Sequence, residues 1–170
     1  MKRFRAAIAA CLMAIVMMGT VFPAKAAEEP NISAGGCVLI EAQTGRVLFA
    51  QNAYKQLPMA STTKIMTALL AVEHGGLQEI LSVPKEASGV EGSSIYLEAG
   101  EHITFENLIY GLMMHSGNDA ATAIALHVSG SVEAFAEKMN ERARAIGAKQ
   151  THFVNPHGLP DDAHYTTAYD

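Results

Sequence analysis

The pattern of apolar and polar residues predicts a β-hairpin near the start of the chain, followed mostly by helices. Apolar runs at residues 37–41 and 46–50 flank the turn Gln43-Thr44-Gly45, which is typical of two paired strands. Apolar side chains at helical spacing then predict four helices, over residues 61–74, 104–114, 119–128 and 131–147. The first of these helices is apolar on nearly every side, which indicates a buried helix.

The order of these elements favours an α+β fold, with a helical layer against an antiparallel sheet, over alternating βαβ units. Short extended pieces are predicted at residues 80–83 and 94–97, and residues 148–164 are predicted to be a loop. Two strands and a few short pieces do not make a stable sheet face, so we expect the sheet to be incomplete in this chain. Tyr165-Thr166-Thr167 predicts the entry to a further helix, and we therefore expect a fragment whose remaining strands lie beyond residue 170.

The first 26 residues have the three-part pattern of a secretory signal peptide. Lys2, Arg3 and Arg5 precede an uncharged stretch of 16 residues, and Ala24-Lys25-Ala26 matches a signal peptidase site. As a helix that stretch reaches about 24 Å, which is short of the roughly 30 Å hydrocarbon layer, so a cleaved signal is favoured over a retained anchor. The sequence thus predicts an exported, extracytoplasmic protein of the cell envelope, with residues 27–170 as its folded part.

Charge and cysteine content further narrow the classes of protein to which this chain can belong. The chain has 12 basic and 17 acidic residues, and removal of the signal leaves 8 basic residues against the same 17, a net charge of −9. Such an acidic domain is not expected to bind nucleic acid. Cys11 leaves with the signal, so Cys37 cannot form an internal disulfide, and its apolar neighbours predict a buried, inert thiol.

Ser61-Thr62-Thr63-Lys64 is the first candidate for chemistry. A spacing of three on a helix brings the Ser61 hydroxyl and the Lys64 amine to one face. A serine hydroxyl becomes a nucleophile when a base takes its proton, and a lysine can be that base where burial lowers its pKa. The alternative is that Ser61 is a helix N-cap. The same spacing recurs at Ser82 and Lys85, where Pro84 argues against a functional pair.

Ser116-Gly117-Asn118, 55 residues after Ser61, is the second candidate. It lies in a predicted turn between two apolar helices, so a hydroxyl and an amide can face the same cleft. There Ser116 can relay a proton, and Asn118 can hold Lys64 or a substrate amide. The alternative is an ordinary interhelical turn capped by Asn118 or Asp119.

Together these motifs resemble those of the penicillin-recognising serine acyl-transferases, which use S-x-x-K, S-x-N and a later K-T-G. The chain is most similar to the low-molecular-mass D-alanyl-D-alanine carboxypeptidases. The similarity extends over nearly all of residues 35–170, and beyond the two motifs it rests on residues 38–48, 58–67 and 151–159.

The resemblance implies a β-lactamase/transpeptidase-like fold and a serine D-Ala-D-Ala carboxypeptidase that removes the terminal D-alanine from peptidoglycan stem peptides. It implies that Ser61 is the nucleophile that forms the acyl-enzyme and that Lys64 is the general base. Ser116 is implied as a catalytic proton relay and Asn118 as a substrate-binding residue. β-Lactam antibiotics mimic the dipeptide and are expected to acylate Ser61. No metal or organic cofactor is implied, and the seven histidines show no metal-ligand spacing.

The sequence departs from the family pattern in one respect, because it contains no Lys-Thr-Gly or Lys-Ser-Gly. We therefore expect residues 27–170 to be the N-terminal part of a transpeptidase-like catalytic domain, truncated before the third motif. The full-length parent is expected to be active and this piece inactive. The resemblance is compatible with a membrane-surface anchor in the missing C-terminal part.

Two alternatives stand beside the carboxypeptidase. A class A-like β-lactamase needs a glutamate for its deacylating water, and the glutamates after the second motif (Glu133, Glu137 and Glu141) lie on an amphipathic helix and not in a later loop. A non-catalytic penicillin-sensing or wall-binding domain has no need of Lys64, so the presence of Lys64 favours an enzyme. Endopeptidase or transpeptidase action on crosslinks stays open.

Overall fold

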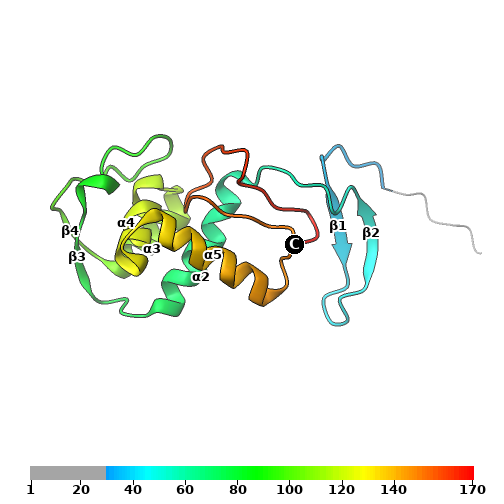
Figure 1. Cartoon of the computed structure of the whole chain (residues 1–170), viewed down its shortest axis with the longest axis horizontal. Helices are drawn as coiled ribbons and strands as arrows, with labels where there is room; N and C mark the ends of the chain where they lie inside the picture. The colour runs from blue at the N-terminus through cyan, green and yellow to red at the C-terminus, as the bar shows by residue number, and fades with distance from the viewer. Residues whose placement is uncertain (1–29) are drawn as a thin grey trace, which may run out of the picture. The chain divides into compact units, whose positions relative to one another are not determined.

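The strands of residues 30–170, the part of the chain that the structure describes, form two separate antiparallel pairs. The structure is a computed structural model, and the expected signal peptide at 1–26, with Cys11, lies outside the described residues. The elements are β1 (Cys37–Ile40), β2 (Val47–Gln51), the 3₁₀ turn η1 (Ala60–Thr62), α2 (Thr63–His74), β3 (Ile80–Ser82), the 3₁₀ turn η2 (Lys85–Ala87), β4 (His102–Thr104), α3 (Phe105–His115), α4 (Asn118–Ser129) and α5 (Val132–Ile146). In Figure 1, the β1–β2 hairpin and the β3–β4 pair lie at opposite ends of the helical cluster.

The β1–β2 hairpin forms where the two apolar runs predicted it, but it buries little. Its turn is held by the Glu41 carboxylate, which accepts the backbone N–H groups of Gln43 at 2.9 Å and Thr44 at 2.8 Å. Leu39 on β1 is 54% exposed and Leu48 on β2 is 51% exposed, because two strands alone cover neither face of a sheet. The expectation of an α+β fold with an incomplete antiparallel sheet is therefore confirmed.

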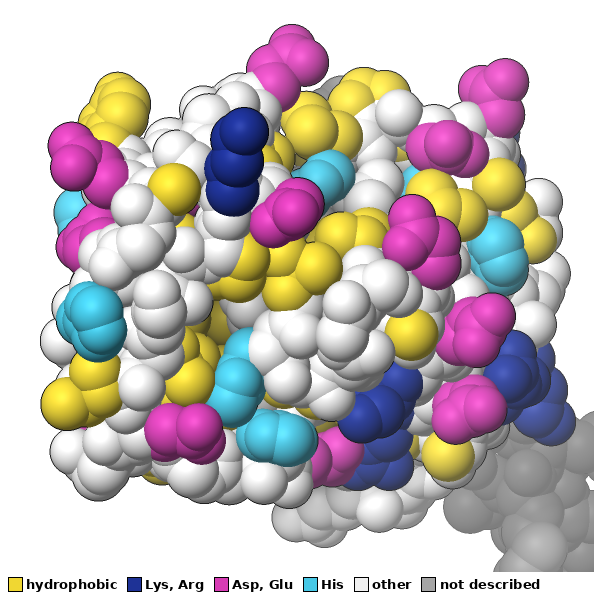
Figure 2. Space-filling model, turned by 60° about the vertical axis from the view of Figure 1, so that its left-hand side comes forward, with side chains coloured by type: hydrophobic (Ala, Val, Ile, Leu, Met, Phe, Trp, Pro, Cys, Tyr) yellow, Lys and Arg dark blue, Asp and Glu magenta, His cyan; other side chains and the backbone are white. Residues whose placement is uncertain are grey.

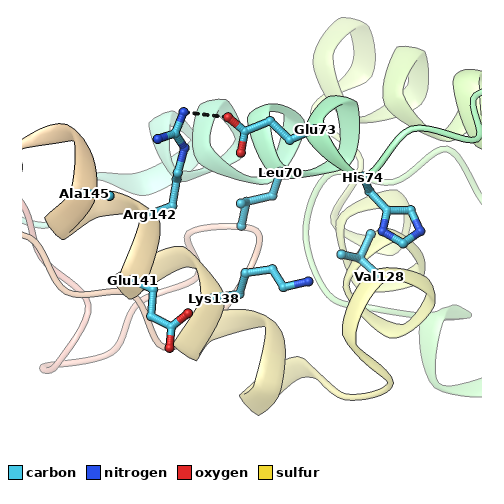
Figure 3. A pocket seen from close by; sticks show the side chains of 8 residues that line it. All are labelled: Leu70, Glu73, His74, Val128, Lys138, Glu141, Arg142 and Ala145. Atoms are coloured by element: carbon cyan, nitrogen blue, oxygen red, sulfur yellow. Dashed lines mark hydrogen bonds and ion pairs between the residues drawn. The ribbon is translucent and has the colours of Figure 1, made fainter.

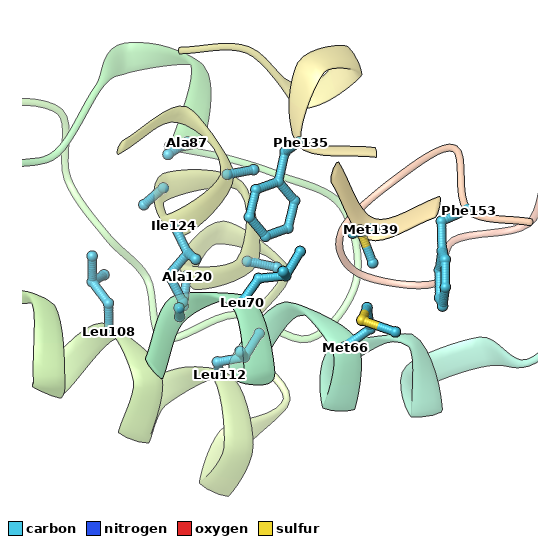
Figure 4. Packing of buried hydrophobic residues seen from close by; sticks show 14 of the residues in the cluster. Met66, Leu70, Ala87, Leu108, Leu112, Ala120, Ile124, Phe135, Met139 and Phe153 are labelled. Atoms are coloured by element: carbon cyan, nitrogen blue, oxygen red, sulfur yellow. The ribbon is translucent and has the colours of Figure 1, made fainter. Parts of the chain in front are cut away.

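The helices bury one shared hydrophobic core, in which α2 packs against α3, α4 and α5. Figure 4 shows side chains from all four helices meeting there, among them Leu70, Leu112, Ile124, Phe135 and Met139. Phe135 and Ile124 are fully buried. This packing fixes the start of α2 relative to the turn between α3 and α4, and those two places carry the candidate motifs.

The prediction that the first helix is buried on nearly every side is wrong for one face. Ile65 is 63% exposed and Val72 is 56% exposed, whereas Thr63, Lys64 and Thr67 are buried. Polar side chains can face inward here because each of these three has hydrogen-bond partners, which offset the cost of burial.

Element boundaries otherwise agree with the sequence to within a few residues. The Thr104 hydroxyl caps α3 by accepting the Asn107 N–H, and the Ser131 hydroxyl caps α5 by accepting the Ala134 N–H. The short strand β4 was not predicted, and the extended piece at 94–97 forms no strand, because its N–H groups bond to a side chain instead of a neighbouring strand.

Three smaller expectations also differ from the structure. Cys37 is half-buried and not fully buried, since its strand β1 belongs to a sheet of only two strands within residues 30–170. Met113 is one of the apolar side chains that predicted the helix over 104–114, yet it is 48% exposed on α3. Tyr165 and Thr166 do not open a helix before residue 170; they form β-bridges with His152 and Leu57, which tie this segment to the rest of the domain.

Figure 2 shows how charged and hydrophobic side chains are distributed on one face of the molecule. On the face shown in Figure 2, acidic side chains lie among hydrophobic and histidine side chains, and lysine and arginine gather in no continuous patch. Between residues 30 and 170, none of the helices has the length and apolar character needed to cross a bilayer.

Candidate active site

The structure brings Ser61, Lys64 and Ser116 into one hydrogen-bonded group. Lys64 Nζ donates to Ser61 Oγ at 3.3 Å, and Ser116 Oγ donates to the same oxygen at 3.1 Å. Ser61 lies in η1, one turn before Lys64 on α2, whereas Ser116 comes from the end of α3. The Ser61 side chain therefore does not serve as a helix cap: α2 has Thr62 at its N-cap position, without a side-chain cap bond.

Lys64 is held in a position suited to a base. The residue is only 3% exposed, and its Nζ also donates to the His157 carbonyl at 2.8 Å. Burial lowers the pKa of Lys64, since desolvation disfavours the ammonium form. With one N–H on the His157 carbonyl, a neutral amine can direct its lone pair at the Ser61 hydroxyl and accept that proton.

Two residues at this site, Ala60 and Ser116, have backbone conformations in the left-handed region. Ala60, just before Ser61, has φ +47°, and Ser116 has φ +56°. Such conformations cost non-glycine residues about 1–3 kcal/mol and persist only where the surroundings impose them. For Ala60 the surroundings include Gly158, whose Cα lies so close that an added Cβ would be 1.9 Å from the Ala60 carbonyl oxygen.

The segment that contains Gly158 is fastened to α2 by buried hydrogen bonds. Thr67 Oγ1 donates to the Pro156 carbonyl at 2.6 Å. The Val154 N–H donates to His164 Nδ1, so the ring proton is assigned to Nε2, which donates to Thr63 Oγ1 at 2.7 Å. These bonds hold the His157 carbonyl over Lys64.

Replacing Gly158 with alanine is expected to destabilise the domain strongly. The new methyl group would overlap the Ala60 carbonyl, and alanine disfavours the φ of +89° at this position. We expect the free energy of unfolding in urea to fall by about 3 kcal/mol. Gly45→Ala is the matched control, because Gly45 has φ +72° but open space around it. Equal losses in the two variants would contradict the close approach.

The pKa of His157 predicts a loss of stability in acid. Burial, then the charges of Lys64 and His164, lower this pKa from 6.5 to about 4. Between these two pH values the unfolded chain binds a proton that the folded chain does not, so the folded state loses stability as the pH falls. The loss is at most about 3 kcal/mol.

Chemical denaturation of wild type and His157→Gln at pH 7 and pH 4 tests this expectation. Glutamine at 157 is neutral at both pH values, so the variant is expected to lose less stability on acidification than wild type. His102→Gln, at an exposed position, is the control and should follow wild type. The same pH dependence in His157→Gln and wild type would contradict the assignment.

Asn118 lies beside this group but is not bonded to it. Its Nδ2 donates to the Glu91 carbonyl at 2.6 Å and its backbone N–H donates to the Ser93 carbonyl at 2.7 Å. Among the hydrogen bonds of residues 30–170, none joins Asn118 to Ser61 or Lys64. The structure therefore brings together three of the four predicted site residues and bonds the fourth, Asn118, to the loop at Glu91 and Ser93.

Sequence reasoning missed two contributors from the 148–164 loop, His157 and Gly158. His157 contributes a backbone carbonyl, which any residue type can supply, so its identity gives no signal. The sequence does contain a signal for Gly158, because a glycine that ends the turn Asn155-Pro156-His157-Gly158 indicates a position with positive φ. Only the fold shows that this glycine faces Ala60.

A separate cavity of about 550 Å³ lies between α2 and α5. Figure 3 shows its lining, with the Arg142 guanidinium paired to the Glu73 carboxylate at 2.6 Å. This cavity holds neither motif, so we do not place the candidate chemistry there. Within residues 30–170, no group of three or more His, Cys, Asp or Glu side chains is arranged to hold a metal ion.

Comparison with known proteins identifies relatives over nearly the whole chain. Residues 23–170 match the peptidase S11 family, described as D-alanyl-D-alanine carboxypeptidase. D-alanyl-D-alanine carboxypeptidase DacF of Bacillus subtilis is 38% identical over 178 aligned residues, which cover 100% of this chain and 46% of the relative. DacA of Escherichia coli is 36% identical over 83% of this chain and 38% of its own length.

Solved structures agree with this relationship. The crystal structure of D-alanyl-D-alanine carboxypeptidase DacD from Francisella tularensis is 33% identical, with a TM-score of 0.81, over 92% of this chain and 39% of that one. The chain thus spans less than half the length of these relatives. On the match to residues 23–170 and the similarity in sequence and fold, this chain belongs to the D-alanyl-D-alanine carboxypeptidase family, peptidase S11.

Proposed function

We propose that this chain supplies the nucleophile and general base of a serine D-Ala-D-Ala carboxypeptidase that trims the terminal D-alanine from peptidoglycan stem peptides. The observation that carries the proposal is the double hydrogen bond to Ser61 Oγ, from buried Lys64 at 3.3 Å and from Ser116 at 3.1 Å. A hydroxyl in contact with a desolvated amine and a second hydroxyl has both a base and a proton relay within reach.

The proposed reaction has two steps. Neutral Lys64 takes the Ser61 proton while Ser61 Oγ attacks the carbonyl carbon of the penultimate D-alanine. The C–N bond then breaks, and the leaving amine of the terminal D-alanine receives a proton through Ser116, which forms the acyl-enzyme ester. Water hydrolyses that ester in the second step and regenerates the Ser61 hydroxyl. We propose substrate binding as the role of Asn118.

β-Lactams are proposed to react in the same acylation step as the peptide substrate. Ser61 Oγ attacks the lactam carbonyl and the ring C–N bond opens, but the amine stays tethered to the acyl group. The ester is then hydrolysed slowly, so the antibiotic is held on Ser61.

The domain assignment is part of the proposal. Residues 27–170 form the N-terminal part of a transpeptidase-like catalytic domain, and the strand with the K-T-G motif belongs to the sequence that follows. Residues 1–26 act as a secretory signal, which places the enzyme outside the cytoplasm in the cell envelope. A membrane-surface anchor after the catalytic domain is compatible with this arrangement.

Release of D-alanine tests the function. The complete protein, meaning the full-length gene product that contains residues 1–170, is incubated with a peptide that ends in D-Ala-D-Ala and with the same peptide ending in L-Ala-L-Ala. We expect release of the terminal alanine from the first peptide only, and from neither peptide when residues 27–170 are assayed alone. No release by the complete protein would overturn the proposal, and release by residues 27–170 would overturn the domain assignment.

Penicillin turnover separates the carboxypeptidase from the class A-like β-lactamase. The carboxypeptidase is expected to form a long-lived ester with one equivalent of benzylpenicillin, whereas a lactamase hydrolyses many equivalents. The slow ester is favoured because Glu133, Glu137 and Glu141 lie on α5, and no hydrogen bond within residues 30–170 joins them to Ser61, Lys64 or Ser116. A non-catalytic sensor would also trap penicillin but would release no D-alanine.

A further inference from the structure

The residue after the second motif, Asp119, has a buried carboxylate with no cationic partner. It is fully buried on the first turn of α4, and none of the ion pairs within residues 30–170 includes it. An isolated buried carboxylate is costly unless hydrogen bonds replace its water. The bonds that do so reach across to a different segment of the chain.

That segment is the loop at 91–97. Asp119 Oδ2 accepts the Ser94 hydroxyl at 2.6 Å and the Leu97 N–H at 3.0 Å, and both carboxylate oxygens lie 3.1 Å from the Ile95 nitrogen. Burial raises the pKa of Asp119, but these bonds and the Ala120 N–H lower it by more, so the net shift is downward. The carboxylate stays ionised and acts as a fixed acceptor for the loop.

The first half of the same loop holds Asn118. Besides the two bonds from Asn118 to Glu91 and Ser93, Gly92 lies so near that an added Cβ would be 2.6 Å from Asn118 Nδ2. Nδ2 is bonded to the Glu91 carbonyl, whereas no hydrogen bond within residues 30–170 engages the Oδ1 end of the amide. Gly92 is also near Leu159, in the turn that places the His157 carbonyl over Lys64.

We propose that Asp119 is a positioning residue: by fastening the loop at 91–97, it fixes the orientation of the Asn118 amide. This inference rests on the proposed function, and it adds a residue with no contact to Ser61. Loss of the carboxylate frees the loop, and the Asn118 amide then samples other rotamers. The expected consequence is weaker formation of the initial complex with substrate or β-lactam.

Asp119→Asn tests the proposal with two readouts in the complete protein. Hydrogen exchange at the Ile95 and Leu97 amides is expected to speed up by about tenfold or more, because an amide offers one acceptor where the carboxylate offers two. Acylation by a fluorescent penicillin is expected to lose about tenfold in second-order rate, mainly through weaker initial binding. The limiting acylation rate at saturating penicillin should change less.

Two further variants keep the test decisive. Ser94→Ala removes one bond to Asp119 from a half-buried position and should produce the same effects more weakly, which covers the case that Asp119→Asn does not fold. Ile124→Ala lies on the same helix and creates a core cavity, but it removes none of the loop's bonds to Asp119. It should lower the melting temperature without changing exchange at Ile95 or the binding step.

The outcomes separate this proposal from the proposed function. If wild type is not acylated, the proposed function fails, while the exchange readout still reports on the loop. If wild type is acylated and both loop variants lose protection but bind penicillin as wild type does, Asp119 is a structural residue only and the proposal is wrong. Unchanged exchange in the loop variants would also overturn it.

Discussion

Replacement of Ser61 by alanine is expected to abolish D-alanine release and penicillin labelling by the complete protein. The hydroxyl is the proposed nucleophile, so its loss removes the acyl-enzyme path, and we expect a decrease in kcat/KM of roughly 10⁴-fold or more. Stability should change little, since Ser61 is exposed and, among residues 30–170, its hydroxyl bonds only to Lys64 and Ser116. Initial-rate assays of D-alanine release measure the effect.

Ser82→Ala is the matched control for this prediction, because Ser82 begins the second S-x-x-K match in the sequence. Ser82 ends strand β3, and Lys85 begins η2 beyond Pro84, so this pair does not lie on one helix. The control should keep full activity. Residual release by Ser61→Ala within tenfold of wild type would contradict the assigned nucleophile.

Replacement of Lys64 by alanine is expected to reduce acylation by roughly 10²- to 10⁴-fold, the usual contribution of a general base. Lys64→Arg should not restore the rate, because a guanidinium stays protonated and cannot accept the Ser61 proton. The second-order rate of fluorescent penicillin labelling is the measurement. Because burial lowers the pKa of Lys64, the wild-type rate should rise with pH as the amine loses its proton, and this rise should be absent in Lys64→Ala.

Two controls keep the lysine test interpretable. Lys85→Ala, in the second S-x-x-K match, should label as wild type does. Removal of the Lys64 amine leaves the His157 carbonyl without its partner, which costs about 1–3 kcal/mol, so assays are run where the variant is fully folded. Labelling of Lys64→Ala or Lys64→Arg at the wild-type rate would exclude lysine as the base.

The sequence predicted the elements and the site motifs because both depend on local patterns. Two apolar runs around a turn predict the hairpin, and Thr104 and Ser131 predict helix starts as capping residues. A spacing of three along a helix is enough to bring Ser61 and Lys64 together. The resemblance to a family then linked Ser116 to this pair across 55 residues, and the structure confirms that contact at 3.1 Å.

Other features depend on contacts that no local pattern specifies. Lys64 bonds to a backbone carbonyl 93 residues away, and Thr63 bonds to His164 101 residues away. Asp119 seemed from the sequence to be a turn residue or helix cap, and only the fold shows that its carboxylate holds a distant loop. The exposed face of α2, with Ile65, likewise reflects which neighbours surround the helix and not its composition.

Mapping of the penicillin adduct tests the central claim most directly. The complete protein is incubated with benzylpenicillin, its intact mass is measured, and the modified peptide is sequenced by mass spectrometry. The account predicts one penicilloyl group per molecule, in an ester on Ser61. No adduct on a protein that is folded, or an adduct on a residue other than Ser61, would contradict it.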